Sequence, residues 1–70
     1  MTNRSMKAIS TNVRNRRLDL RMTQKDLAEK CGLSTNYISR IERAEVSPTI
    51  DTLEKLTKAL KVDSSEILPF

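Results

Sequence analysis

Apolar residues recur along the chain at the three- and four-residue spacing of amphipathic helices. No run alternates apolar with polar residues for long enough to predict a strand. Ile9, Val13 and Leu20 fall on one stripe of a predicted helix, and Arg17 lies between them at the same spacing. A later helix has a stripe of leucines: Leu53, Leu56 and Leu60. The pattern therefore predicts an all-α fold.

Capping residues divide the chain into five predicted helices. Thr23 followed by Asp26 reads as a capping box, and Ser34 is a good N-cap. Ser47-Pro48-Thr49 stops one helix and starts the next. The predicted helices are 7–20, 24–31, 34–43, 49–61 and a last short turn over 63–68. We expect residues 1–6 to form a flexible tail and 7–70 to form one domain.

The only glycine, Gly32, stands between two of these helices. Glycine reaches left-handed backbone conformations without a Cβ clash, so Gly32 is expected to end one helix in a sharp turn. Ala28 is small where the two helices would cross, and Leu33 would fill the corner. This joint spacing favours a helix-turn-helix over an ordinary helical hairpin. Four residues are expected to face the core: Leu27, Cys31, Ile38 and Ile41.

Composition excludes several classes of function. Seventy residues are enough for only one domain with one core. The lone Cys31 cannot form an internal disulfide, and a chain without histidine offers no zinc site or His-based catalysis. We therefore expect no enzyme activity, no metal and no cofactor. Because no apolar run could form a signal peptide or span a membrane, a cytoplasmic location is expected.

Charge is unevenly distributed along the chain. Residues 1–30 hold eight Lys or Arg against three acidic groups, a net of +5. Residues 31–70 hold five basic and six acidic groups, a net of −1. A basic half indicates an anionic partner, nucleic acid before membrane, although a solvated basic surface would have the same composition.

Three stretches resemble the Xre/Cro-type helix-turn-helix domain of phage repressors and of restriction–modification controller proteins. They are VRNRRLDLRMTQKDLAEKCGLSTNYISRIER, SPTIDTLEKLTKALKV and SEIL. The resemblance implies a single five-helix, lambda-repressor-like domain without enzyme activity. It implies a transcriptional regulator that binds a pseudo-palindromic operator on double-stranded DNA as a homodimer. RNA polymerase is a further candidate partner.

Two turns depart from the family pattern. Arg21 stands where the family usually carries glycine, so its φ is expected to be positive. Ala44 replaces another usual glycine and is followed by Glu45. Family members touch phosphate from this second loop, and an acidic residue there argues against that contact.

The outer face of the third predicted helix carries residue types that read base edges. Asn can bond to adenine and Arg to guanine, whereas any amphipathic helix also has a solvated polar face. The resemblance places base contacts at Thr35, Asn36, Ser39 and Arg40. Candidate phosphate contacts are Gln24, Arg14, Arg21, Lys25, Tyr37 and Arg43. By the resemblance, Gln24 would also brace the recognition helix, and the ring of Tyr37 could instead cover the core.

Arg17 is interpreted as structural, because burying a lone charge on an apolar stripe is costly. Glu42 lies one turn past Ile38 on the buried side of its helix, and the family pairs residues at these two positions. At the other end of the chain, Leu68 and Phe70 are apolar groups near a terminus, and we expect them in the dimer interface. The linker and fourth helix, from Val46 to Leu53, are the alternative.

Two other functions fit the same fold. An antitoxin of a toxin–antitoxin operon would bind a toxin as well as DNA, although such proteins usually carry an extra segment. A helix-turn-helix adaptor would bind protein, but the third helix is neither acidic nor apolar outside.

Overall fold

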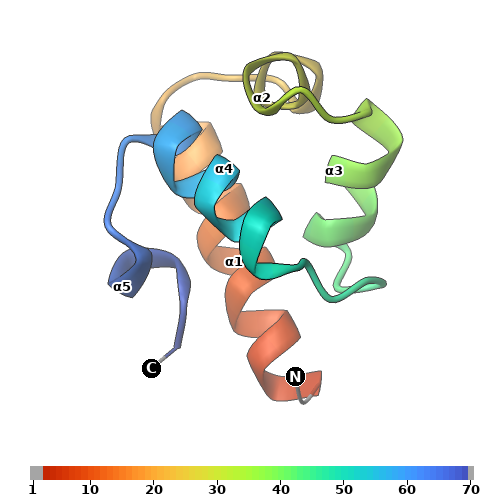
Figure 1. Cartoon of the computed structure of the whole chain (residues 1–70), viewed down its shortest axis with the longest axis vertical. Coiled ribbons are helices and arrows are strands. Elements are labelled where there is room, and N and C mark those ends of the chain that lie inside the picture. Colours follow the sequence, from red (N-terminus) through yellow and green to blue (C-terminus); the bar gives the residue numbers. More distant parts are fainter. Residues whose placement is uncertain (1–2, 70) are drawn as a thin grey trace.

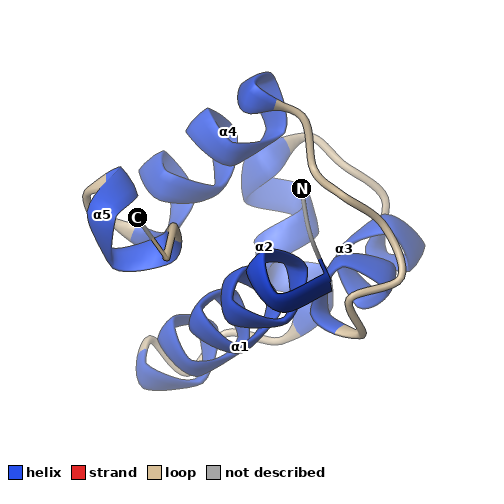
Figure 2. Ribbon diagram, turned by 90° about the horizontal axis from the view of Figure 1, so that it is seen from below, coloured by secondary structure: helices blue, strands red, loops and turns tan. Residues whose placement is uncertain are grey.

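The computed structural model describes residues 3–69. Over this range the chain forms five helices, and none of the described residues lies in a strand: α1 (Asn3–Asp19), α2 (Gln24–Cys31), α3 (Thr35–Glu42), α4 (Ile50–Leu60) and α5 (Ser64–Ile67). α1 packs against α3, α4 and α5, and α2 packs against α3 and α4 (Figure 1). α3 and α5 lie on opposite sides of the molecule in both views (Figures 1 and 2). The predicted all-α, five-helix fold is confirmed.

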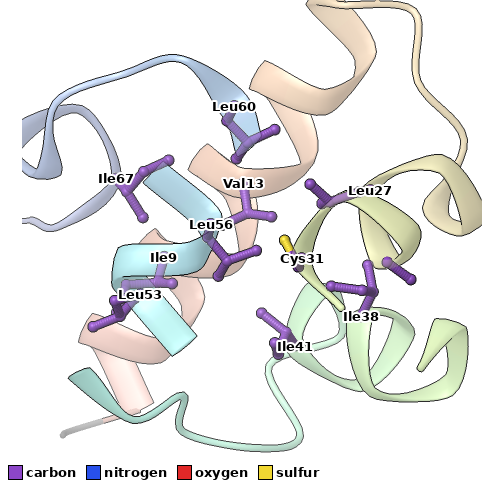
Figure 3. Close-up of a cluster of buried hydrophobic side chains, with 11 residues drawn as sticks. Ile9, Val13, Leu27, Cys31, Ile38, Ile41, Leu53, Leu56, Leu60 and Ile67 are labelled. Atoms are coloured by element: carbon purple, nitrogen blue, oxygen red, sulfur yellow. The ribbon is translucent and has the colours of Figure 1, made fainter. Parts of the chain in front are cut away.

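Aliphatic side chains from all five helices form a single core (Figure 3). The predicted stripes face inwards, because Ile9 of α1 and Leu56 of α4 are 1% and 0% exposed. The buried apolar set is Ile9, Val13, Leu27, Ala28, Cys31, Ile38, Ile41, Leu53, Leu56, Leu60 and Ile67. Leu33 is half-buried at the edge of this core. The predicted placement of these residues is confirmed.

Side-chain caps fix where three helices begin. The Thr23 hydroxyl accepts from the Asp26 N–H at 3.0 Å, and the Asp26 carboxylate accepts from the Thr23 N–H at 2.9 Å. This is the reciprocal capping box that the sequence predicts for α2. Ser34 caps α3 as expected, and Thr49 caps α4 in the same way. The observed bounds of α2 match the predicted ones.

Left-handed residues end the first four helices. Arg21, Gly32, Ala44 and Lys61 have φ between 56° and 68°. Each is followed by an amide that bonds five residues back, as in Leu33 N–H to the Ala28 carbonyl at 2.9 Å. A Cβ on Gly32 would meet no atom within 4 Å, so glycine is favoured there by its backbone angle and not by a lack of space. The positive φ predicted for Arg21 is present.

The start of α1 differs from the prediction. The helix begins at Asn3, so residues 3–6 are helical where a flexible tail was expected, and Met1 and Thr2 lie outside the described residues. Ser5 and Met6 are partly buried and precede Ile9 by four and three residues. They extend the buried face of α1 by one turn, which accounts for the earlier start.

Two polar side chains of α1 hold the C-terminal half of the chain in place. Asn12 Nδ2 donates to the Ile67 carbonyl of α5 at 2.9 Å. Arg16 Nε donates to the Leu60 carbonyl at 3.0 Å, at the end of α4 where helix carbonyls lack partners. Sequence reasoning missed both contacts, because Asn and Arg on the edge of a helix give no signal of a distant carbonyl.

Candidate nucleic-acid interface

α3 has one buried face and one exposed face. Ile38 and Ile41 are 0% and 1% exposed and fix the helix to the core. Thr35, Asn36 and Arg40 are exposed on the other side. α3 lies at one side of the molecule (Figure 1), and the exposure of these side chains leaves its polar face accessible. Three of the four predicted base-contact residues are thus accessible together.

Ser39, the fourth, is half-buried and bonded to α2. Its hydroxyl donates to Gln24 Oε1, and Gln24 Nε2 donates to Glu42 Oε1 at 3.2 Å. Gln24 is the first residue of α2, so its side chain joins the start of α2 to two successive turns of α3. Gln24 therefore braces α3, as the resemblance implied.

Arg17 and Glu42 form a buried ion pair between α1 and α3. Arg17 Nε donates to Glu42 Oε2 at 2.7 Å and Nη2 donates to Oε1 at 2.9 Å. The side chains are 10% and 3% exposed. The hydrogen bond to Glu42 raises the pKa of Arg17 above its ordinary value, and burial opposes the rise. Arg17 Nη1 also donates to the Met22 carbonyl at 2.8 Å, so each of the three guanidinium nitrogens donates a hydrogen bond.

The candidate phosphate contacts include residues that are simply exposed and one that is also held in an ion pair. Arg14, Arg21 and Lys25 are exposed. Arg43 is exposed too, but its Nε donates to Glu45, which raises the pKa of Arg43 and lowers that of the Glu45 carboxyl. Glu45 Oε1 also lies 3.9 Å from Arg40 Nε. Glu45 therefore interacts with both Arg40, a predicted base contact, and Arg43, a predicted phosphate contact.

Cys31 belongs to the hydrophobic core, and Tyr37 packs against it. Tyr37 is half-buried and packs against the apolar cluster, as one of its two predicted roles requires. Cys31 is 7% exposed, and its Sγ lies 3.7 Å from the Lys55 carbonyl oxygen. Burial raises the pKa of the Cys31 thiol, which keeps the thiol protonated and unreactive at neutral pH.

An apolar groove runs between α4 and the end of the described chain. Its lining includes Ile50, which is 74% exposed, together with Leu53 and the half-buried Leu68. Leu68 is one of the two predicted dimer-interface residues. The other, Phe70, lies outside the described residues.

None of the described helices is long and apolar enough to cross a membrane.

Comparisons with known proteins place this geometry among DNA-binding regulators. The family model described as helix-turn-helix matches residues 13–67. Control protein C.BamHI of Bacillus amyloliquefaciens is 39% identical over 71 residues, covering 100% of this chain and 88% of that protein. The immunity repressor protein of Bacillus phage phi105 is 40% identical over 52 residues, covering 74% of this chain but only 36% of the repressor. The crystal structure of the restriction-modification controller protein C.Esp1396I superimposes with a TM-score of 0.79 at 41% identity, covering 83% of this chain and 75% of that one.

Proposed function

Because the chain belongs to the helix-turn-helix family of DNA-binding transcriptional regulators, we propose that it binds a pseudo-palindromic operator as a homodimer with α3 in the major groove. The observation that carries this proposal is the two-faced α3. Ile38 and Ile41 anchor the helix, while Thr35, Asn36 and Arg40 are exposed together. An exposed polar helix on a firm support is what entry into a major groove requires.

The proposed contacts divide into base readers and phosphate binders. Asn36 would bond to an adenine edge and Arg40 to a guanine edge, with Thr35 and Ser39 beside them. The proposed phosphate binders are Gln24, Arg14, Arg21, Lys25, Tyr37 and Arg43. The first turn of α2 supports Gln24 and Lys25 in this role, because the free amides and the dipole of a helix N-terminus attract phosphate.

A homodimer would pair the α4–α5 grooves of two copies. Ile50 and Leu68 would leave water there, which explains a large exposed apolar residue at the start of α4. α3 and α5 lie on opposite sides of a molecule that measures 27 × 23 × 20 Å, and α5 contributes Ile67 to the groove (Figures 1 and 2). Two recognition helices about 34 Å apart, one DNA turn, would each lie about 17 Å from the twofold axis, which these dimensions allow.

The regulator is proposed to be of the restriction–modification controller type. The alignment with control protein C.BamHI takes in the whole chain, whereas that with the phage repressor takes in 74% of it. Neighbouring genes for an endonuclease and a methyltransferase would support this assignment, and phage genes would contradict it. Such a regulator would act on DNA in the cytoplasm, and an activating role would require contact with RNA polymerase.

Selection of binding sites from a random duplex library tests the proposal. We expect a palindromic consensus, and an affinity that falls steeply as salt rises because several phosphates per dimer are neutralised. Arg40→Ala should cost about 1–3 kcal/mol and relax preference at one base pair of each half-site. Lys25→Ala, the matched control, should weaken binding to all sequences alike. Failure to select any duplex would overturn the proposal.

A further inference from the structure

Four side chains form a directed row of hydrogen bonds from the core to the DNA-facing side of α3. Arg17 donates to Glu42 through Nε and Nη2, and Gln24 Nε2 donates to Glu42 Oε1 at 3.2 Å. Ser39 Oγ then donates to Gln24 Oε1. The direction of each bond follows from the chemistry of the group before it.

The buried end of the row fixes the orientation of the Gln24 amide. A guanidinium has donors only, so both Glu42 oxygens accept in the pair with Arg17. The Glu42 side chain is 3% exposed, so water has little access to the pair. If the amide were turned over, the Gln24 oxygen would face a carboxylate oxygen, and two acceptors would repel. The NH₂ group of Gln24 must therefore face Glu42.

The orientation of Gln24 in turn fixes the proton of Ser39. With its NH₂ group on Glu42, Gln24 turns its carbonyl oxygen towards Ser39. A carbonyl oxygen has no proton to give, so the Ser39 hydroxyl must donate its only proton to it. The lone pairs of Ser39 Oγ remain, and Ser39 can only accept from any further partner.

We propose that Ser39 reads an exocyclic amino group, and so prefers adenine or cytosine over guanine or thymine on the strand that it faces. In the major groove, adenine N6 and cytosine N4 are donors, whereas guanine O6 and N7 and thymine O4 are acceptors. Gln24 and Glu42 are positioning residues that set this preference without touching the base. The inference rests on the proposed function, because it requires α3 to lie in the groove.

Binding-site selection with three proteins tests it: wild type, Ser39→Ala and Gln24→Met. We expect the wild type to favour adenine or cytosine about three- to tenfold at one position of each half-site, the ratio expected of a single hydrogen bond. Ser39→Ala should lose the preference at that position alone. Gln24→Met removes the acceptor at similar length and frees the hydroxyl to rotate, so guanine or thymine should become acceptable there.

Two controls separate a change of preference from a loss of affinity. Lys25→Ala, the neighbour of Gln24 on α2, should bind more weakly with the wild-type preference at every position. A duplex with purine in place of the contacted adenine, or 2-pyrimidinone in place of the contacted cytosine, lacks the amino group. It should weaken the wild type about three- to tenfold and leave Ser39→Ala unaffected.

The outcomes distinguish this inference from the proposed function. If the wild type selects no duplex, the proposed function fails. If it selects an operator but Ser39→Ala changes no position, or the position that depends on Ser39 prefers guanine or thymine, only the role of Ser39 is overturned. An unchanged preference in Gln24→Met would show that Gln24 does not set the direction of the Ser39 hydroxyl, and would equally overturn it.

Discussion

Arg17 on α1 presents the Nε–Nη2 edge of its guanidinium to Glu42 on α3, through bonds of 2.7 Å from Nε and 2.9 Å from Nη2 to the two carboxylate oxygens. This pair joins α1 to α3. Because the same carboxylate accepts from Gln24, the pair also reaches the start of α2. One buried contact therefore joins the fold to the proposed DNA-binding surface.

Removing either partner of this pair should strongly destabilise the protein. Arg17→Ala or Glu42→Ala leaves the other charge buried without its partner, which typically costs about 3–5 kcal/mol. A small domain has a total stability of about 5–15 kcal/mol, so urea unfolding followed by circular dichroism should show a large drop in midpoint. Arg17→Met combined with Glu42→Leu removes both charges and should be more stable than either single variant. If Arg17→Ala keeps its midpoint and loses only DNA affinity, Arg17 is a DNA contact.

Replacing alanine by glycine should have opposite effects on stability at a left-handed helix end and inside a helix. Ala44→Gly should stabilise the protein by about 1–2 kcal/mol, because Ala44 has a φ of 58°. Ala59→Gly lies inside α4 and should destabilise it by about 1 kcal/mol. Gly32→Ala should cost about 1–2 kcal/mol through its φ of 68° alone, since the added Cβ meets no atom. Equal signs for Ala44→Gly and Ala59→Gly in urea unfolding would contradict this account.

Glu45 is expected to restrain DNA binding. Its carboxylate pairs with Arg43 and lies 3.9 Å from Arg40, beside the proposed groove-reading face. Glu45→Gln removes that competitor and should raise affinity about three- to tenfold in low salt, with the gain shrinking as salt screens the charge. Glu29→Gln on α2 makes the same change in net charge away from these arginines and should have a smaller effect. Equal gains from the two variants, measured by fluorescence anisotropy, would mean that only net charge matters.

We expect the dimer interface to form at the apolar groove between α4 and the end of the described chain. Ile50→Glu places a charge on the 74% exposed residue of the groove and should shift sedimentation from dimer to monomer while helical content persists. Leu18→Glu is the matched control, since Leu18 is 52% exposed but does not line the groove. Binding to a full palindrome should fall far more in Ile50→Glu than binding to a half-site. A dimeric Ile50→Glu protein would place the interface elsewhere.

Acid should weaken the start of α2 through Asp26. Hydrogen bonds from Thr23 lower the pKa of Asp26 below its ordinary value of 3.8. A lowered pKa in the folded state adds stability that is present above that ordinary value and is lost as the pH falls through the folded-state pKa. The stability advantage of wild type over Asp26→Asn should therefore shrink in urea unfolding as the pH falls below about 4. An advantage that stays constant with pH would show that the charge of Asp26 does not matter. Glu45, whose pKa is also lowered, is the same in both proteins and cancels.

Local pattern was enough to predict most of the fold. The 3.6-residue period places Ile9 and Leu56 inside, and the Thr23–Asp26 box starts α2 where the pattern says it should. Gly32 predicts the sharp turn because the turn depends on the left-handed backbone angle of that one residue. These features depend on residues within one or two turns of each other, so the sequence alone determines them.

Contacts between distant residues were decided by tertiary packing. Asn12 and Ile67 are 55 residues apart, and Gln24 and Ser39 are 15 apart on different helices. No periodicity or capping rule indicates that these atoms meet, because a hydrogen bond needs its donor and acceptor within about 3 Å and only the packed helices bring them there. The sequence predicted which side chains of α3 would read DNA, and that assignment stays a prediction. The direction in which Ser39 presents its hydroxyl was decided by the packing of α1, α2 and α3 around Glu42.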